Sequence, residues 1–534
     1  MSGTTGTSAF TGVRPLLKVS LHQDARNIGP WVVLISVLSV SSILAYAWVF
    51  PDLEDRQALS MRLSANPALA LVFGPPRDLL TSDGFNSWRA GVLGAFFAAL
   101  MAIFIVVRNS RAQEDSGQAE LLASGVLGRQ ARLTVAVLMA AIASLALGVV
   151  SFVATISVGG GAVPTLLLSS TYAASGLMFA GVAAVAVQLG SDARAANGLA
   201  VAALGILYVA RGYVDSSGAP DWAAWLTPIG WLQETRPATR NDPWPLLAAV
   251  GLAAVLVGVA FALHARRDYG MGLIPPRPGP ARQHRATVWW LALRLNRGSL
   301  VSWLVAFAGL GVVFGYLATS IGEVVADDPG MARLLAAGVV AEADLEFAFL
   351  MTVLQLVGII AAVLGVQVVM RIHAEELDYR VEPLLAGAVR RRTYFASNAA
   401  IAFLAPGAAM LVGGSVVGLV AASVKDSISA VDVLLQSAAT VPAVWTLVAL
   451  ALAAVGAHPA KRVVGWLGVV ATFGLTILGP TFDLPDWALD ISPLRHVPPV
   501  VLPDPDWSGL GWVSLVTLLL VTVAFAGFRR RDVG

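Results

Sequence analysis

The 534-residue sequence lacks cysteine and is poor in charge. Without cysteine, the chain has no disulfide, Cys-ligated zinc, iron–sulfur cluster or thiol nucleophile. Charged residues make up 13% of the chain, whereas soluble proteins contain roughly 25%. The six histidines are scattered and no HExxH motif occurs. These absences exclude a soluble protein and the common zinc hydrolases, and we predict no metal site.

A phosphate-binding loop is also missing. None of Lys18, Lys425 and Lys461 lies in a GxxxxGK[ST] motif, so the chain has no P-loop with which to hydrolyse ATP. No grouping of acids, histidines or nucleophiles suggests a catalytic centre. We therefore predict that the chain is not an enzyme and carries no cofactor of its own.

Long apolar runs dominate what is present. The chain is 57% hydrophobic, with a mean hydropathy of +0.75. About 20 apolar residues cross the hydrocarbon layer of a bilayer. Twelve runs reach or approach that length: Pro30–Phe50, Trp88–Val107, Leu133–Val158, Thr165–Leu189, Gly198–Val214, Trp244–Leu263, Ser299–Ile321, Phe347–Met370, Ala396–Val424, Val433–Gly456, Val463–Pro480 and Leu510–Phe528. We predict an all-α integral membrane protein with twelve transmembrane helices.

The distribution of basic residues predicts the orientation of these helices. If the N-terminus is cytoplasmic, the segments on the inner side hold most of the 35 Lys and Arg residues. The outer segments are rich in acids instead, for example Asp52, Glu54 and Asp327. This sorting follows the positive-inside rule. It predicts two cytoplasmic termini, and it explains the pI of about 9.0 without a nucleic-acid partner.

A charged segment between apolar runs occurs twice, and we call its two copies the polar islands. Ala112–Arg129 reads AQEDSGQAELLASGVLGR, and Ala374–Arg391 reads AEELDYRVEPLLAGAVRR. Aligned without gaps, the two islands share Ala112/Ala374, Glu114/Glu376, Glu120/Glu382, Leu122/Leu384, Gly125/Gly387 and Arg129/Arg391. A single such island is explained by a charged cytoplasmic loop. Its repetition indicates a cytoplasmic element that binds a two-fold partner.

Other landmarks divide the chain into two halves. The segment 264–270 (HARRDYG) matches the C-terminal segment 528–534 (FRRRDVG), and a Pro-rich stretch follows the first of them. We predict one six-helix half over residues 1–274, a cytoplasmic linker over 275–288 and a second half over 289–534. Both halves begin inside and contain an even number of spans, which predicts parallel repeats. Arg14–Asn27 and Trp289–Arg297 predict interfacial helices where the halves begin.

Local spacing predicts the shape of the polar islands. In the second island, Glu376 and Arg380 stand i,i+4 apart and can pair on a helix. Pro383 then disfavours helix at the preceding residue but suits the first turn of a new helix. In the first island, Ser116 and Gly117 supply the bend. A bent pair of short helices along the membrane surface is expected in each half.

The predicted spans contain almost no ionisable residues. Gln188, Gln355, Gln367 and Gln436 are their main polar side chains. An ion-coupled carrier keeps acidic, basic or histidine side chains at this depth to bind its coupling ion. We therefore expect the energy for transport to come from outside the chain. In the outer loops, Pro67–Phe73 and Met331–Ala337 are short amphipathic stretches that can close a pathway or form a structural lid.

The sequence resembles the actinobacterial ABC-2-type permeases of the polyketide-antibiotic (tetronasin-type) exporter family. The resemblance rests on Arg111–Arg129, Ala374–Arg391, Thr227–Trp231 with Arg236 and Pro237, and Gly527–Gly534, and it extends over the whole chain. Gln113, Gln118 and Pro383 depart from the family pattern, which leaves open whether the two islands bind a partner equally well.

The resemblance implies a permease subunit in the bacterial cell membrane, surrounded by lipid, that exports small hydrophobic or amphipathic compounds such as antibiotics. Two copies of a soluble ABC ATPase would bind the islands and supply ATP and Mg²⁺ chemistry. The residues assigned to ATPase coupling are Glu114, Glu120, Arg129, Glu376, Glu382 and Arg391, and the short inner loops add Arg194 and Arg462. The residues assigned to the substrate pathway are Phe96, Phe97, Met101, Phe104, Tyr208, Phe349, Gln355 and Phe473.

Two other functions compete with this hypothesis. One is an ion-coupled carrier, and the other is a membrane-embedded lipid-handling protein without an ATPase partner. The sequence does not identify the substrate, and export rather than import follows only from the resemblance.

Overall fold

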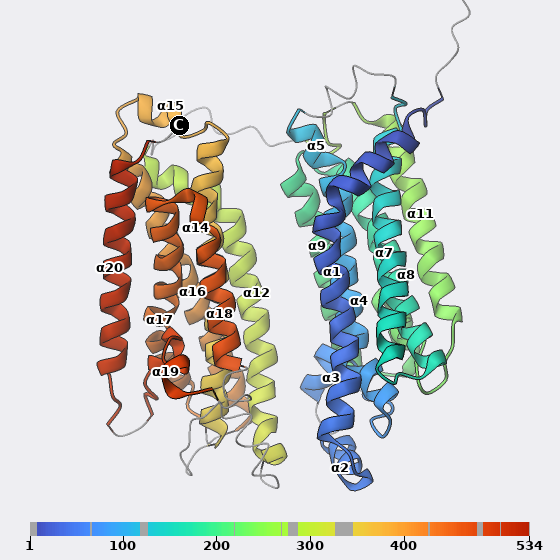
Figure 1. Cartoon of the computed structure of the whole chain (residues 1–534). Helices are drawn as coiled ribbons and strands as arrows, with labels where there is room; N and C mark the ends of the chain where they lie inside the picture. Colours follow the sequence, from blue (N-terminus) through green and yellow to red (C-terminus); the bar gives the residue numbers. More distant parts are fainter. Residues whose placement is uncertain are drawn as a thin grey trace, which may run out of the picture. The chain divides into compact units, whose positions relative to one another are not determined.

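The computed structural model describes residues 8–64, 67–117, 127–217, 219–268, 270–275, 287–325, 345–425, 428–477, 484–501 and 504–532. Within these residues the chain is helical and contains no strand. It divides into two compact units, Met1–Gly279 and Pro280–Gly534 (Figure 1). Eleven of the described helices are long and apolar enough to cross a membrane. The prediction of an all-α multi-pass membrane protein is confirmed at this level.

The described part of unit 1 contains six long helices and several short ones. The long helices are α1 (Val13–Val49), α4 (Ser82–Arg108), α7 (Ala131–Ser157), α8 (Ala162–Leu189), α9 (Ala193–Ser216) and α11 (Trp244–Arg266). The short helices are α2 (Leu53–Ser64), α3 (Pro67–Phe73), α5 (Arg111–Asp115), η1 (Asp221–Leu226) and α10 (Pro228–Gln233).

Unit 2 follows the same order of long helices. These are α12 (Val288–Val325), α14 (Leu345–Leu377), α16 (Arg391–Val424), α17 (Ala430–Ala457), α18 (Val463–Ile477) and α20 (Ser508–Arg530). The short helices are α15 (Glu382–Ala386), η2 (Pro459–Lys461), α19 (Asp486–Leu489) and η3 (Pro493–His496). The described part of α18 has 15 residues and is not among the eleven candidate spans.

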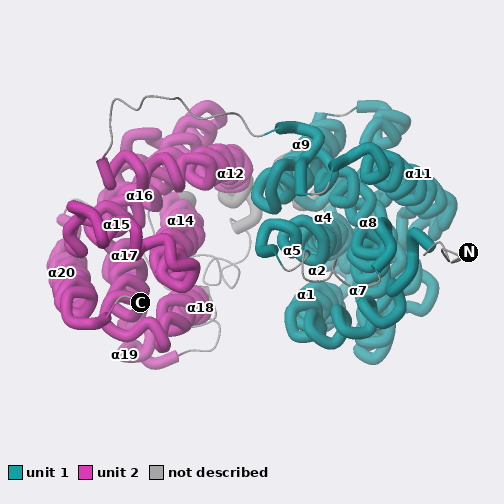
Figure 2. The backbone as a smooth tube through the Cα atoms, turned by 90° about the horizontal axis from the view of Figure 1, so that it is seen from above, with its two compact units in different colours: residues 1–279 teal, residues 280–534 magenta. Residues whose placement is uncertain are grey.

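The two units have corresponding cores. In unit 1, α4 and α8 are mostly buried while α9 and α11 are mostly exposed, and α8 lies between α4 and α11 (Figure 2). In unit 2, α14 and α17 are the buried helices and α20 is mostly exposed. The exposed positions of α11 and α20 carry many Leu and Val residues. Such surfaces are suited to lipid, because the hydrocarbon layer solvates apolar side chains.

Each unit has two ends that we name by their short helices. In unit 1, α5 lies at one end and α3 at the other (Figure 1), and we call these the α5 end and the α3 end. At the α5 end, backbone hydrogen bonds join the chain before α1 to the start of α7: Gly128 N donates to Thr11 O (2.9 Å) and Gln130 N to Ala9 O (3.0 Å). The end of α11 also lies here, since the Arg129 guanidinium donates to Ala265 O (3.1 Å). Unit 1 therefore begins and finishes at the same end.

The GxxxG pair of the seventh predicted span is a packing site. On α12, a Cβ added at Gly311 would lie 2.7 Å from Gly413 O, and one added at Gly315 would lie 2.7 Å from Val420 Cβ. Both contacts are with α16, whose backbone the two glycines allow to approach closely. A Cβ added at Gly309, on the same helix, would have no neighbour within 4 Å.

We expect Gly311→Ala and Gly315→Ala to destabilise unit 2 by about 1–3 kcal/mol each, since the added methyl groups would force the two helices apart. Thermal unfolding of the purified protein in detergent measures this loss. Gly309→Ala is the matched control and should change stability by less than about 1 kcal/mol. Equal effects at all three positions would contradict this account of the packing.

Candidate functional site

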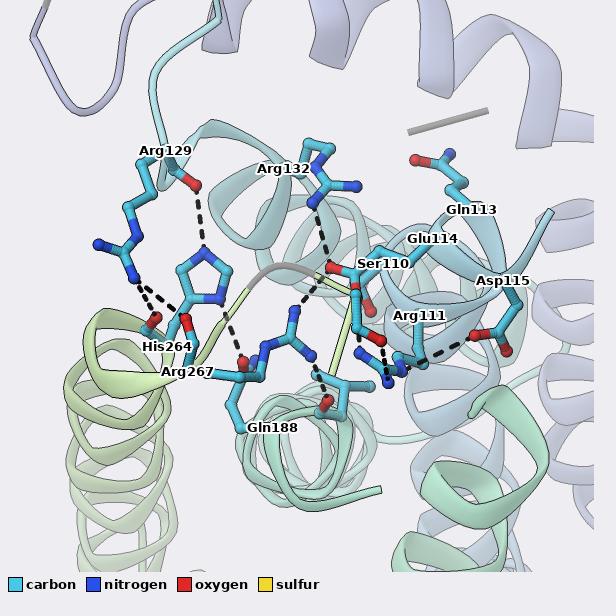
Figure 3. A network of polar contacts seen from close by, with 12 residues as sticks. Ser110, Arg111, Gln113, Glu114, Asp115, Arg129, Arg132, Gln188, His264 and Arg267 are labelled. Atoms are coloured by element: carbon cyan, nitrogen blue, oxygen red, sulfur yellow. Dashed lines mark hydrogen bonds and ion pairs between the residues drawn. The ribbon is translucent and has the colours of Figure 1, made fainter. Parts of the chain in front are cut away.

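The first polar island is organised around Glu114, whose side chain is 6% exposed. Three guanidinium groups surround its carboxylate (Figure 3). Arg111 Nη1 lies 2.6 Å from Oε2, Arg267 Nη2 lies 2.7 Å from Oε1 and Arg132 Nη2 lies 3.1 Å from Oε1. Charge-assisted hydrogen bonds of this kind are about twice as strong as neutral ones. Glu114 therefore neutralises a cluster of basic residues that come from α5, α7 and the segment after α11.

The arginines that surround Glu114 also hold backbone groups of other helices. Arg111 Nη2 donates to the carbonyl oxygens of Ser191 and Gly270, and the latter bond is 3.0 Å long. Arg267 Nη1 donates to Val187 O at 3.1 Å. Burial lowers the pKa of Arg267, and the negative charge of Glu114 opposes that shift. The cluster thus connects α5 to the end of α8 and to the segment after α11.

The start of α9 is attached to the same short helix. Asp115 of α5 accepts a hydrogen bond from Ala193 N at 2.6 Å. Asp192 caps the N-terminus of α9 by accepting from Ala195 N at 2.8 Å, which satisfies one of the free N–H groups of the first turn. A displacement of α5 would therefore act directly on α9.

Arg129, at the end of the first island, makes a second set of contacts (Figure 3). Its guanidinium donates to the carbonyl oxygens of Ala265 and Arg267, both at 3.1 Å. Its own carbonyl oxygen lies 3.1 Å from His264 Nε2, and His264 Nδ1 lies 3.1 Å from Gln188 Oε1. Gln188, a polar side chain of a predicted span, thus belongs to this cluster at the α5 end.

Unit 2 contains the corresponding ion pair. Arg531 Nη2 lies 2.6 Å from Glu376 Oε1 and donates to Oε2 at 2.8 Å. The Glu376 side chain is 7% exposed. Arg531 Nε donates to Gly456 O, near the end of α17, and Arg391 Nη1 donates to Arg531 O, both at 3.1 Å. Each of these contacts has a counterpart in unit 1.

The two kinds of sequence repeat therefore meet in space. Glu114 and Glu376 belong to the polar islands, whereas Arg267 and Arg531 belong to the matching segments at the ends of the halves. In both units the island glutamate binds the end-segment arginine. In both, the last arginine of the island binds the carbonyl oxygen of that arginine. We call this arrangement the Glu–Arg latch.

The surroundings of the two latches differ. The position of Arg111 is taken in unit 2 by His373, whose Nδ1 lies 3.5 Å from Glu376 Oε2. The position of Arg132 is taken by Tyr394, whose hydroxyl donates to Glu375 Oε2 at 3.0 Å. Within the described residues, Glu114 is thus paired with three arginines and Glu376 with one arginine and one histidine.

The i,i+4 pair expected in the second island does not form. Glu376 binds Arg531 instead, and Arg380 pairs with Asp378 at 3.4 Å on the surface. The reason is the turn after α14, where Tyr379 adopts a positive φ of 55° and ends the helix before Arg380. The predicted second short helix is present as α15, with Pro383 in its first turn. In the first island, the bend at Gly117 is present with a φ of 75°.

The other predicted coupling residues are arranged differently. Glu382, Arg194 and Arg462 are exposed, in the first turn of α15, the first turn of α9 and the turn before α18. Arg462 Nη1 lies 3.3 Å from His373 Nε2. Glu120 lies outside the described residues. Because Glu114 and Glu376 are buried in internal ion pairs, any direct contact with a partner falls to the exposed side chains.

The predicted pathway residues differ in their surroundings within each unit. Phe96 of α4 packs against Tyr208 of α9 with ring centroids 5.0 Å apart, and Phe97 lies beside it. Met101 and Phe349 are buried in the cores of their units, while Phe104 and Phe473 are exposed. Gln355 Nε2 donates weakly to Leu494 O, at 3.4 Å. Their role in a pathway stays a prediction.

Sequence reasoning missed a buried ion pair near the α3 end of unit 1. Arg211 and Asp215 lie at the end of α9, 3.0 Å apart, and are 0% and 7% exposed. Arg211 Nη2 also donates to Leu71 O at 2.9 Å and to Val72 O at 3.2 Å. The pair thus holds α3 against α9. The i,i+4 spacing of the two residues was the available signal, but it did not show that they are buried.

Comparison with known proteins gives consistent results. The family model described as "Multidrug efflux system permease Rv1217c, C-terminal domain" matches residues 31–264 and 286–529. The chain is also similar to the multidrug efflux system permease protein Rv1217c of Mycobacterium tuberculosis (strain ATCC 25618 / H37Rv). The two are 35% identical over 532 residues, which cover 98% of this chain and 96% of that protein. Both matches extend over nearly the whole of the two units.

Proposed function

This chain belongs to the family of multidrug efflux system permeases represented by Rv1217c, and on that premise we propose that it is the transmembrane subunit of an ATP-driven ABC exporter. Its substrates would be hydrophobic or amphipathic compounds, including antibiotics, as in the ABC-2-type (tetronasin-type) exporters that the sequence resembles. The observation that carries the coupling proposal is the Glu–Arg latch, which occurs at one end of each unit. A duplicated cytoplasmic element is what two copies of one soluble ATPase require.

The proposed topology has twelve spans arranged as two parallel six-helix repeats. α18 supplies the twelfth, because it occupies the place of α9 in the order of long helices. In unit 2, Arg371 of α14 donates to Leu295 O of α12 at 2.8 Å, so the first helix of the unit starts at the end where the Glu376 latch lies. Each unit therefore begins and finishes at one end, as an even number of crossings requires. The positive-inside rule places the latch ends and both chain termini in the cytoplasm of a bacterial cell.

We propose that the latches transmit force rather than bind the ATPase directly. The exposed residues Glu382, Arg194 and Arg462, together with Glu120, would contact the two ATPase subunits, in which ATP and Mg²⁺ bind. Glu114 and Glu376 would hold α5 and the end of α14 against the last helix of their own unit. When ATP binding closes the ATPase pair, a push on these segments would tilt the helices of each unit together. The predicted aromatic residues, such as Phe96 and Tyr208, would then border the pathway.

Charge reversal at the exposed acids tests this arrangement. We expect Glu120→Arg with Glu382→Arg to reduce ATPase stimulation and drug efflux at least about tenfold, because each reversal places like charges across the proposed contact. Expression and thermal stability should stay unchanged, since Glu382 makes no buried contact. The measurements are efflux from cells and ATP hydrolysis by the complex of this chain with a soluble ABC ATPase that co-purifies with it.

Glu54→Arg provides the control for the reversal, because Glu54 is an exposed acid of α2, near the α3 end of unit 1. That variant should transport normally. Unchanged efflux in the double variant would contradict the proposed coupling site. Efflux by the purified chain alone in ATP-free vesicles would favour the ion-coupled carrier or the lipid-handling protein instead.

A further inference from the structure

The start of α1 carries a row of basic side chains. Arg14, Lys18, His22 and Arg26 follow one another at intervals of four residues, and all four are exposed. Four residues make slightly more than one turn of an α-helix, so neighbouring members of such a row differ in direction by only about 40°. The four side chains therefore share one side of the helix, and we call them the basic row.

The opposite side of this segment packs against unit 1. Leu16, Leu17 and Leu21 are partly buried against its hydrophobic core. Just before the helix, the ring of Phe10 lies 6.4 Å from the ring of Phe261 in α11. These contacts fix the rotation of the segment about its axis, so the basic row points away from unit 1.

The positive charge of the basic row is not balanced by the protein. Among the described residues, none of its four side chains forms an ion pair or a hydrogen bond. The acid of this segment, Asp24, is buried on the other side of the helix. Its carboxylate lies 3.3 Å from Arg108 Nε and accepts a hydrogen bond from Asn109 Nδ2 at 2.6 Å. The row therefore presents uncompensated positive charge at the surface.

The apolar exposed side of α1 continues directly into the basic row. α1 is one unbroken helix and is among the candidate membrane spans. Val33, Val37 and Leu44 are exposed and lie about two, three and five turns after Arg26, which places them on the same side of the helix. That side is suited to lipid, because the hydrocarbon layer solvates apolar side chains. Figure 1 shows the first turns of α1 inclined to the rest of the helix, so the row stays near the membrane surface.

The start of α12 in unit 2 presents a different surface. Trp289, Trp290 and Leu293 are exposed there beside Arg297. Tryptophan favours the membrane interface through its amphipathic ring, and this preference does not require a charged headgroup. The basic row is thus a feature of unit 1 that anchoring in a membrane does not by itself explain.

We propose that the basic row binds the phosphate groups of anionic phospholipids in the leaflet at the α5 end. Arginine and lysine form charge-assisted hydrogen bonds with phosphate oxygens, and basic segments next to a membrane span are attracted to anionic lipids. Val19, exposed beside the row, would lie at the boundary between headgroups and acyl chains. Zwitterionic headgroups carry their own cation and would leave the charge of the row unbalanced.

Lipid bound to the row would also hold the first polar island in place. Backbone hydrogen bonds from Gly128 and Gln130 join the chain before α1 to the start of α7. Asn109, between α4 and α5, binds Asp24 on the inner side of the same segment. Anionic lipid would therefore stabilise the α5 end of unit 1 by fixing the position of α1.

A spin label beside the row tests this proposal on the full-length chain without any partner protein. Because the chain has no cysteine, Ala25→Cys provides a single labelling site, and Ala25 is exposed on the side of the row. The accessibility of the label to a neutral, water-soluble relaxing agent is measured in nanodiscs. It should be lower when about one third of the lipid is phosphatidylglycerol than in pure phosphatidylcholine. A salt concentration of about 1 M, which shortens the Debye length to about 3 Å, should remove this protection.

Substitutions within the row provide the variant and its controls. Combining Arg14→Gln, Lys18→Gln and Arg26→Gln should abolish the protection, because each Lys or Arg near an anionic surface strengthens binding about fivefold. Arg14→Lys with Arg26→Lys keeps the charge and should retain the protection. Arg240→Gln removes an exposed arginine before the start of α11 and should also retain it. Thermal unfolding shows whether each variant remains folded.

Four outcomes would overturn the proposal. The first is equal accessibility of the label in the two lipid compositions, and the second is protection that survives the removal of all three charges. Protection by inorganic phosphate in pure phosphatidylcholine would instead indicate a site for soluble anions. Protection by a soluble ABC ATPase, but not by phosphatidylglycerol, would assign the row to that partner.

Discussion

Replacing Glu114 by glutamine is expected to destabilise unit 1 by about 3–5 kcal/mol, because it leaves several buried arginines without their counter-charge. Arg111 and Arg267 are almost fully buried and Arg132 is largely buried, and all three bind the Glu114 carboxylate. The glutamine side chain would keep the shape but not the charge. Since whole domains are stable by only about 5–15 kcal/mol, a loss of this size would also abolish efflux.

Denaturant unfolding of the purified chain in detergent measures this effect, and drug efflux from cells measures its consequence. Asp115→Asn is the control, since the neighbouring carboxylate is 35% exposed and lies 3.8 Å from Arg111. It should cost less than about 1 kcal/mol, as exposed ion pairs do. Equal losses for the two variants, or normal stability of Glu114→Gln, would refute the role given to Glu114.

The helical organisation could be predicted from the sequence because it follows from local composition. Apolar runs of about 20 residues must form helices in a bilayer, where backbone groups have no water to bind. Eleven of the described helices meet the length and composition of a span. The GxxxG spacing of Gly311 and Gly315 is typical of close helix packing, and a Cβ added at Gly311 would meet the α16 backbone. Twelve spans in two parallel repeats, and the orientation of the termini, stay predictions.

The contacts of the polar islands could be predicted only in part. Repetition of Glu114 and Glu376 in the sequence predicted a common role for these two positions. It did not show their partners, because Arg267 and Arg531 are more than a hundred residues away along the chain. The local rule paired Glu376 with Arg380, but a positive φ at Tyr379 ends the helix before that pair can form. The partner of Glu376 is therefore set by tertiary contacts and not by the local i,i+4 spacing.

The buried pair Arg211–Asp215 shows a second limit of sequence reasoning. Its i,i+4 spacing is typical of exposed helices, and the predicted span ended between the two residues. The burial comes from α3, which covers the end of α9 through the backbone contacts of Arg211. Hydropathy along the chain carries no information about such a covering segment.

The surroundings of the two latches differ, so the same substitution should cost different amounts of stability in the two units. We expect Arg→Gln to cost more in unit 2 and Glu→Gln to cost more in unit 1. In unit 2, Arg531 is the arginine partner of Glu376, and it binds both carboxylate oxygens. Among the described residues, Arg531→Gln would leave His373 as the remaining partner of this buried carboxylate, at a cost of about 3 kcal/mol or more. Arg267→Gln in unit 1 would cost less, about 1–2 kcal/mol, since Glu114 keeps Arg111 and Arg132.

For the acids the order should reverse. Glu114→Gln removes the negative charge that lies between three arginines, whereas Glu376→Gln removes the negative charge beside one arginine and one histidine. Glu114→Gln should therefore be the more damaging, while Arg531→Gln should exceed Arg267→Gln. Loss of packing alone would not make one substitution worse in unit 1 and the other worse in unit 2. Each substitution changes the shape of the side chain in the same way in both units, and the latches correspond in position. The free energies of unfolding of the four variants decide between charge balance and packing. If the same unit lost more stability for both Glu→Gln and Arg→Gln, the electrostatic explanation of the latch would be excluded.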